Sequence, residues 1–159
     1  MKKLFLCLVL FVTSCGGASQ QSEWSSIKVQ NVASRKIISV DDLLNNRLTI
    51  VSLWSVTCTP CRRELPWLQK IYTENTSIQI VGIDIGDNVA DIKEFTSALH
   101  LTFPIFRDEL GAMLSAMKIA QVPATFAVRS DGVVVWKHLG ALTYSELQRQ
   151  IKKFESLGA

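Results

Sequence analysis

The central motif of this chain is Trp54-Ser-Val-Thr-Cys58-Thr-Pro-Cys61. A β-rich apolar run ends just before it at Leu53, and apolar residues at helical spacing follow it. The two cysteines therefore lie where a strand ends and a helix begins. The free N–H groups and the dipole of such a helix end stabilise a thiolate. We therefore predict thiol–disulfide exchange, in which Cys58 attacks a disulfide and Cys61 resolves the mixed disulfide.

The first residues have the composition of an export signal. Lys2 and Lys3 precede an apolar run over Leu4–Val12, which is too short for a membrane-spanning helix. The sequence Val12-Thr-Ser-Cys15 then resembles a bacterial lipobox, in which Cys15 is lipidated and becomes the mature N-terminus. We predict a signal peptide over residues 1–14, a lipidated and flexible tether over 15–25 and one domain over 26–159. The alternative is an ordinary secretory signal without lipidation.

The chain has four cysteines, and their positions leave one pair for redox chemistry. Cys7 would leave with the signal peptide and Cys15 would carry the lipid, so Cys58 and Cys61 have only each other to pair with. A two-residue gap favours a readily reduced disulfide over a structural staple across a long loop. Without the two lysines of the signal, 15 basic residues of the 17 stand against 14 acidic ones. This balance gives no indication of nucleic-acid binding.

The rest of the pattern predicts an α/β fold, a mixed central sheet with helices on both faces. Short β-rich runs bounded by turn residues predict strands, and apolar residues at helical spacing predict helices. The expected strands are 27–32 and 36–38 as an N-terminal hairpin, 48–54, 78–85, 103–106, 124–128 and 133–138. The expected helices are a short one near Leu43, then 59–72, 88–99, 109–117 and 143–157.

These segments resemble the thioredoxin fold, and within it the exported TlpA/ResA-like thiol-disulfide oxidoreductases. The motif from Trp54 to Cys61 is similar to their Trp-x-x-x-Cys-x-Pro-Cys active site. The sequence Val81-Gly-Ile-Asp84, followed by a helix and Phe103-Pro-Ile105, resembles the insert of TlpA-like domains. The sequence Val122-Pro-Ala-Thr-Phe126 resembles the loop that carries a cis-proline in this family.

The resemblance implies roles for the residues around the two cysteines. Trp54, Thr59 and Pro60 would support the active site. Val122 and a cis Pro123 would lie against the cysteines and shape the binding of a partner.

Glu64 is a candidate proton acceptor for the second cysteine. It lies one helical turn after Cys61 and matches a glutamate that ResA-like proteins carry near the buried thiol. Ser52 stands where thioredoxin has a buried proton-accepting aspartate, so Glu64 is the carboxylate placed for this role. The alternative makes Glu64 an exposed partner of neighbouring polar residues on the same helix. A raised carboxyl pKa would favour the proton-transfer role.

We expect an oxidoreductase that is lipid-anchored in the bacterial cell envelope, outside the cytoplasm, and that reduces disulfides of partner proteins. It would be a monomer, would use no cofactor besides the Cys58–Cys61 disulfide and no metal, and would need a membrane thiol–disulfide electron donor. The resemblance also implies a role in cytochrome c maturation. The alternatives are a thiol oxidant of the same fold and a non-catalytic binding lipoprotein.

Two other uses of the cysteines fit the sequence poorly. A zinc site would need two further ligands, and the sequence contains no second Cys-x-x-Cys and no histidine pair. A peroxiredoxin would need Pro-x-x-x-Thr/Ser-x-x-Cys. Ser55 fits the hydroxyl position, but Val51 stands in place of the proline.

Overall fold

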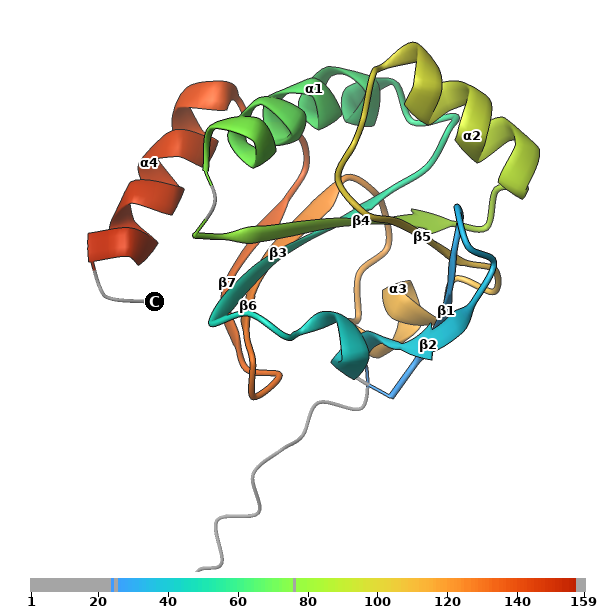
Figure 1. The fold of residues 1–159 in the computed structure, drawn as a ribbon, viewed down its shortest axis with the longest axis horizontal. Helices are drawn as coiled ribbons and strands as arrows, with labels where there is room; N and C mark the ends of the chain where they lie inside the picture. Colours follow the sequence, from blue (N-terminus) through green and yellow to red (C-terminus); the bar gives the residue numbers. More distant parts are fainter. Residues whose placement is uncertain (1–23, 25, 76, 157–159) are drawn as a thin grey trace, which may run out of the picture.

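The computed structural model describes residues 24, 26–75 and 77–156, and these build one domain around a central sheet (Figure 1). The sheet has seven strands in the order β2-β1-β5-β4-β3-β6-β7. The strands are β1 (Lys28–Asn31), β2 (Ile37–Ser39), β3 (Leu48–Trp54), β4 (Gln79–Ile85), β5 (Ile105–Asp108), β6 (Ala124–Arg129) and β7 (Val134–Leu139). The helices are η1 (Val40–Leu43), α1 (Thr59–Glu74), α2 (Val89–Ala98), α3 (Ala112–Ala116) and α4 (Tyr144–Ser156). The predicted signal peptide and Cys15 lie outside the described residues.

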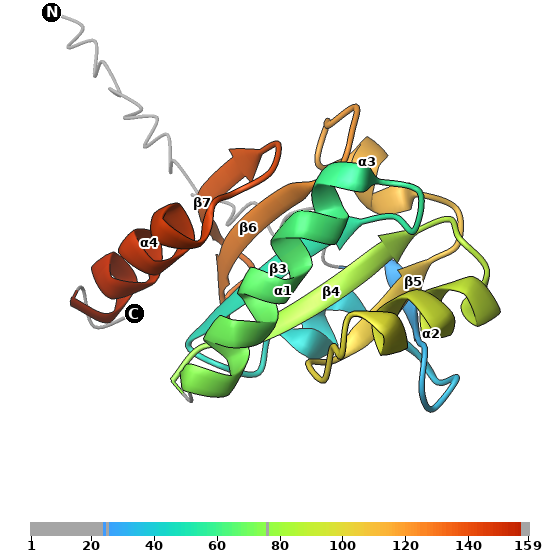
Figure 2. The ribbon, with the colours of Figure 1, turned by 90° about the horizontal axis from the view of Figure 1, so that it is seen from above.

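Helices cover both faces of the sheet, which confirms the predicted fold class. The helices α1, α2 and α4 lie on one face, and α3 lies on the other (Figures 1 and 2). Each face has its own apolar cluster. The first cluster packs Leu65 of α1 and Leu147 of α4 against the sheet, and the second packs Leu43 of η1 and Met113 of α3 against the opposite face.

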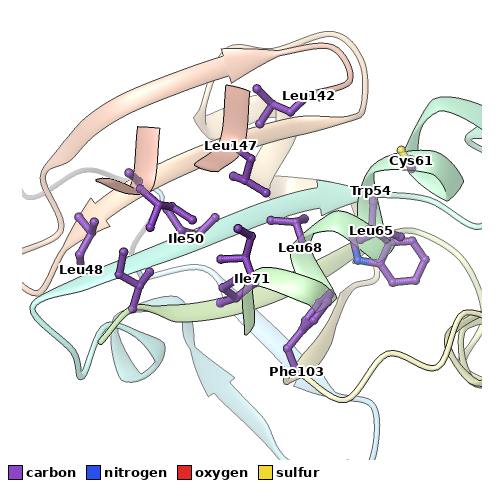
Figure 3. Packing of buried hydrophobic residues seen from close by; sticks show 14 of the residues in the cluster. Leu48, Ile50, Trp54, Cys61, Leu65, Leu68, Ile71, Phe103, Leu142 and Leu147 are labelled. Atoms are coloured by element: carbon purple, nitrogen blue, oxygen red, sulfur yellow. The ribbon is translucent and has the colours of Figure 1, made fainter. Parts of the chain in front are cut away.

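Strand β3 is the centre of the sheet and is buried along its whole length. It pairs in parallel with β4 and antiparallel with β6. Because both of its faces are covered, nearly every position carries an apolar side chain, as the sequence predicted. Figure 3 shows Leu48, Ile50 and Trp54 along this strand, in the same apolar cluster as Leu65 and Leu68 of α1. The carboxyl ends of β3 and β4 meet at one edge of the sheet, and α1 begins there.

Two predicted segments differ from the structure. The strand expected over 103–106 lies over Ile105–Asp108 instead. Pro104 precedes this strand and has no N–H to donate to a neighbouring strand. Its carbonyl accepts a hydrogen bond from the Gly82 N–H at 3.0 Å. The helix expected over 109–117 is only the short α3. Gly111 precedes it in a left-handed conformation with φ of 67°, so a continuous helix cannot start at residue 109. None of the helices in the described part of the chain is long and apolar enough to span a membrane.

Candidate active site

The two cysteines form a disulfide at the N-terminus of α1, with their Cα atoms 5.3 Å apart. Cys58 is the N-cap residue, and its Sγ accepts a hydrogen bond from the Cys61 backbone N–H at 3.2 Å. Pro60 lies in the first helical turn, where its missing N–H costs no helical hydrogen bond. Cys61 is fully buried, whereas Cys58 is partly exposed. A partner can therefore reach Cys58, and the helix end can stabilise its thiolate.

Trp54 supports the site from below. It is the last residue of β3 and is fully buried, and its ring stacks on Phe95 of α2 with the ring centroids 5.2 Å apart. Figure 3 shows Trp54 under the first turns of α1, close to Cys61. Thr59, by contrast, is exposed on the first turn of the helix. Trp54 thus contributes packing, and Thr59 contributes surface beside the disulfide.

Glu64 is buried rather than exposed, because only 1% of its surface is accessible. Its Oε1 accepts from the Thr125 hydroxyl at 2.8 Å, and its Oε2 accepts from the Leu142 backbone N–H at 2.9 Å. Burial raises the pKa of this carboxyl, and the Leu142 N–H, the Thr125 hydroxyl and the charge of His138 oppose that shift. The alternative of an exposed surface partner is therefore wrong for Glu64.

The Val122–Pro123 peptide bond is cis, as the resemblance implied. Pro123 is buried and its carbonyl accepts from the Gly140 N–H at 2.9 Å, while Val122 is partly buried. Strand β6 begins directly after Pro123, and its second residue, Thr125, is the hydroxyl partner of Glu64. The loop with the cis-proline is thus linked through Thr125 to the helix that carries the cysteines.

A buried carboxyl group that the sequence analysis gave no role lies at the same edge of the sheet. Asp84 of β4 is fully buried, and its register partner in β3 is Trp54. Its Oδ1 accepts from the Asp87 backbone N–H at 3.0 Å, and the Asp87 carboxylate accepts from the Val56 backbone N–H at 2.7 Å. A charged residue inside the apolar run 80–85 was the sequence signal for this site.

The pKa of Asp84 is raised to about 8, chiefly by burial and then by the hydrogen bond and negative charge of the Asp87 side chain. The Asp87 backbone N–H and the charge of Arg107 act in the opposite direction. Within the described part of the chain, no group of three or more histidine, cysteine, aspartate or glutamate side chains could hold a metal ion.

Fold and site together define a thioredoxin-like protein with a Cys-x-x-Cys disulfide at a helix N-terminus. The chain belongs to the AhpC/TSA family, whose family model matches residues 22–137.

Curated relatives carry the name thiol-disulfide oxidoreductase ResA. The protein of that name from Geobacillus kaustophilus is 25% identical over 107 residues, which cover 66% of this chain and 62% of the relative. The one from Geobacillus thermodenitrificans is 23% identical over 143 residues, which cover 84% of this chain and 82% of the relative. The match to the first of these thus spans less than two thirds of the relative's length.

Solved structures show the same fold. StoA from Bacillus subtilis superposes with a TM-score of 0.64 at 26% identity, over 79% of this chain and 97% of that one. A secreted disulfide oxidoreductase of Mycobacterium tuberculosis, described as homologous to E. coli DsbE, superposes with a TM-score of 0.70 at 21% identity. That match covers 86% of this chain and 99% of the other.

Proposed function

We propose that this chain is a thiol–disulfide oxidoreductase of the cell envelope whose redox centre is the Cys58–Cys61 disulfide. The observation that carries the proposal is the asymmetry of the pair at the start of α1. Cys58 is partly exposed and its Sγ accepts a backbone N–H, while Cys61 is fully buried. One sulfur is thus placed to attack and the other to resolve. The printed names of the ResA relatives support this reading.

In the proposed direction the reduced protein gives two electrons to a disulfide in a partner protein. The Cys58 thiolate attacks one sulfur of that disulfide, forms a mixed disulfide and releases the other sulfur as a thiolate. The Cys61 thiolate then attacks the Cys58 Sγ, which restores the intramolecular disulfide and releases the second substrate thiolate. A membrane-bound dithiol donor would return the protein to its reduced form. The oxidised pair in the structure corresponds to the end of this cycle.

Glu64 is the group that we propose takes the proton from Cys61. A buried thiol resists ionisation, so its attack needs an acceptor within reach. Glu64 lies one turn along α1 and is itself buried, and burial raises the pKa of its carboxyl. Its hydrogen bonds to Thr125 and Leu142 hold the carboxyl in place between α1, β6 and the segment before α4.

The natural substrate in this proposal is a disulfide-bearing protein outside the cytoplasm, with proteins of cytochrome c maturation as the leading candidates. The lipid anchor at Cys15 would hold the domain at a membrane. The resemblance of the active-site motif and the cis-proline loop to ResA-like proteins supports this assignment. We propose a monomer.

A redox titration of the full-length chain tests the proposal. The protein is equilibrated in dithiothreitol and glutathione buffers, free thiols are alkylated, and the reduced fraction is read by mass spectrometry. We expect a reversible two-electron transition near the potential of thioredoxin, about −270 mV. A potential near that of DsbA, about −120 mV, would instead make the protein an oxidant. Without any reversible exchange, the non-catalytic alternative would hold.

A further inference from the structure

The Asp87 side chain accepts a hydrogen bond from the short loop before the cysteines, residues 55–57. The Val56 backbone N–H donates to the Asp87 Oδ2 at 2.7 Å. Within the loop region, the Cys58 N–H donates to the Ser55 carbonyl at 3.1 Å. These two hydrogen bonds link Cys58 through its preceding loop to Asp87, which lies in the segment between β4 and α2.

Asp87 is itself fixed by two neighbours. Its backbone N–H donates to the Asp84 Oδ1 at 3.0 Å, and its carbonyl accepts from Arg107 Nε. Arg107 lies on β5 and forms an ion pair with Glu109 at 3.3 Å. The buried end of this chain of contacts is thus Asp84, and the exposed end is the loop that precedes the attacking cysteine.

Asp84 has one oxygen that the described residues leave unpaired. Its Oδ2 is buried without a hydrogen-bond partner, and because the residue is inaccessible to solvent, water does not supply one. Burying a charged oxygen without a partner costs much more than burying a neutral one, which favours a neutral Asp84 carboxyl. Because Oδ1 already accepts the Asp87 N–H, the proton is placed on Oδ2. In that form the Asp84 Oδ1 can still accept the Asp87 N–H, and no negative charge faces the Asp87 carboxylate.

We propose that neutral Asp84 is a positioning residue for thiol–disulfide exchange, which holds Asp87 and through it the Val56 N–H, and that ionisation of Asp84 weakens this hold. The inference rests on the proposed function of the disulfide. An ionised Asp84 would set a second negative charge against Asp87, and the two carboxylates would move apart. The Asp87 side chain is the group that can move, because the contacts to Asp84 and Arg107 hold only its backbone and the residue is partly exposed.

The other charged groups near Asp84 have partners of their own and do not account for the repulsion between Asp84 and Asp87. Arg107 from β5 is shared with the Asp87 carbonyl and with Glu109. On the helices that cover this face, the Arg62 guanidinium lies 4.5 Å from the centre of the Phe95 ring, and Asp91 accepts the Asn88 side chain. The pKa of Asp84 is raised to about 8, chiefly by burial, so its ionisation falls in a range of pH that can be measured.

The test compares the full-length wild type with Asp84→Asn at a series of pH values from about 6 to 10, a range set by the raised pKa. The first measurement is the backbone amide chemical shift of Val56 in the oxidised protein. The second is the rate of reduction by dithiothreitol, expressed as the ratio of variant to wild type so that the ionisation of dithiothreitol cancels. Asp108→Asn is the matched control, because Asp108 is also buried but accepts from Met113 N and does not contact the loop.

We expect the Val56 amide to titrate with Asp84 in the wild type and in Asp108→Asn but not in Asp84→Asn. The rate ratio for Asp84→Asn should be near unity at acid pH and rise roughly two- to tenfold at alkaline pH, the worth of one hydrogen bond. A Val56 shift with the same pH dependence in all three proteins, or a flat rate ratio, would overturn the inference. If the wild type did not react with dithiothreitol, the proposed function would fail, and the Val56 titration would still decide whether Asp84 holds the loop.

Discussion

Cys58 and Cys61 differ sharply in their exposure although only two residues separate them. Cys58 is the N-cap residue of α1 and is partly exposed, while Cys61 packs into the apolar cluster with Trp54 and Leu65. Because a thiolate must reach its target to attack, the exposure of Cys58 supports the attacking role that we propose for it. The order of attack can be tested with single substitutions.

The first prediction concerns the mixed disulfide. In Cys61→Ser the Cys58 thiol can still attack, but no resolving thiol remains, so a mixed disulfide should accumulate after incubation with oxidised glutathione. Cys58→Ser should form far less, because the remaining thiol of Cys61 is buried. The adduct is quantified by intact-protein mass spectrometry. Equal trapping by both variants would contradict the assigned roles.

The second prediction concerns Glu64 as proton acceptor. In the wild type the resolving step should slow as pH falls through the raised pKa of Glu64, because a protonated carboxyl cannot take a proton from Cys61. In Glu64→Gln this acidic limb should vanish, and the rate should fall by up to about a hundredfold. The rate is measured as release of the mixed disulfide by stopped-flow fluorescence. The control is Glu74→Gln, an exposed glutamate on the same helix, and an unchanged profile in Glu64→Gln would refute the role.

At the scale of elements, the packing of three side chains over β4 depends on the absence of a side chain at Gly82. A Cβ atom there would lie 2.9 Å from Trp54 Nε1, 3.0 Å from Ile105 Cδ1 and 3.0 Å from Phe103 Cε2. The indole of Trp54 therefore covers Gly82, which leaves room for the ring to stack on Phe95 of α2. This arrangement forms the floor under the first turn of α1.

The third prediction follows from this close approach. Gly82→Ala should lower the free energy of unfolding by about 1–3 kcal/mol, the usual cost of overpacking a core. Urea unfolding followed by tryptophan fluorescence measures the change. A variant as stable as the wild type would mean that the Trp54 ring can shift without cost.

At the scale of the whole molecule, the strand order brings distant residues to one edge of the sheet. Glu64 meets Thr125 and Leu142, which are 61 and 78 residues further along the chain. Val56 meets Asp87, 31 residues away. These contacts tie α1 to β6 and to the segment before α4, and they tie the loop before α1 to the segment after β4. The burial and the hydrogen bonds of each carboxyl at this edge exist only in the folded chain, so the ionisation of these groups is coupled to folding.

The fourth prediction is a dependence of stability on pH. Asp84 has a pKa raised from 3.8 to about 8 in the folded state, so between these values the folded chain binds a proton that the unfolded chain has lost. Stability should therefore fall as pH rises from about 4 to about 8, with a slope from this group of at most about 1.4 kcal/mol per pH unit, and then level off. Glu64, whose pKa is also raised, acts in the same direction.

Urea midpoints at pH 5, 7 and 9, values chosen to bracket a pKa of about 8, measure this dependence. Asp84→Asn cannot ionise, so its midpoint should fall less than that of the wild type over this range. A wild type and a variant with parallel profiles would show that Asp84 is ionised in the folded protein throughout.

Much of the fold could be predicted from local patterns. The apolar run of β3, the hairpin of β1 and β2, and the closing helix α4 all lie close to where the sequence placed them. The predicted boundaries of β5 and α3 were wrong. Pro104 delays the start of the strand and the left-handed Gly111 delays the start of the helix, and apolar spacing reveals neither effect.

The sequence by itself determined the cysteine pair at a strand-to-helix junction, because the motif and its flanking periodicities are local. It also indicated Glu64 and Pro123 through a resemblance, without their surroundings. Only the tertiary structure decided that Glu64 is buried between Thr125 and the Leu142 N–H, and that Asp84 supports the loop before Cys58. Burial and long-range hydrogen bonds depend on which strands become neighbours, and residue spacing along the chain does not specify that.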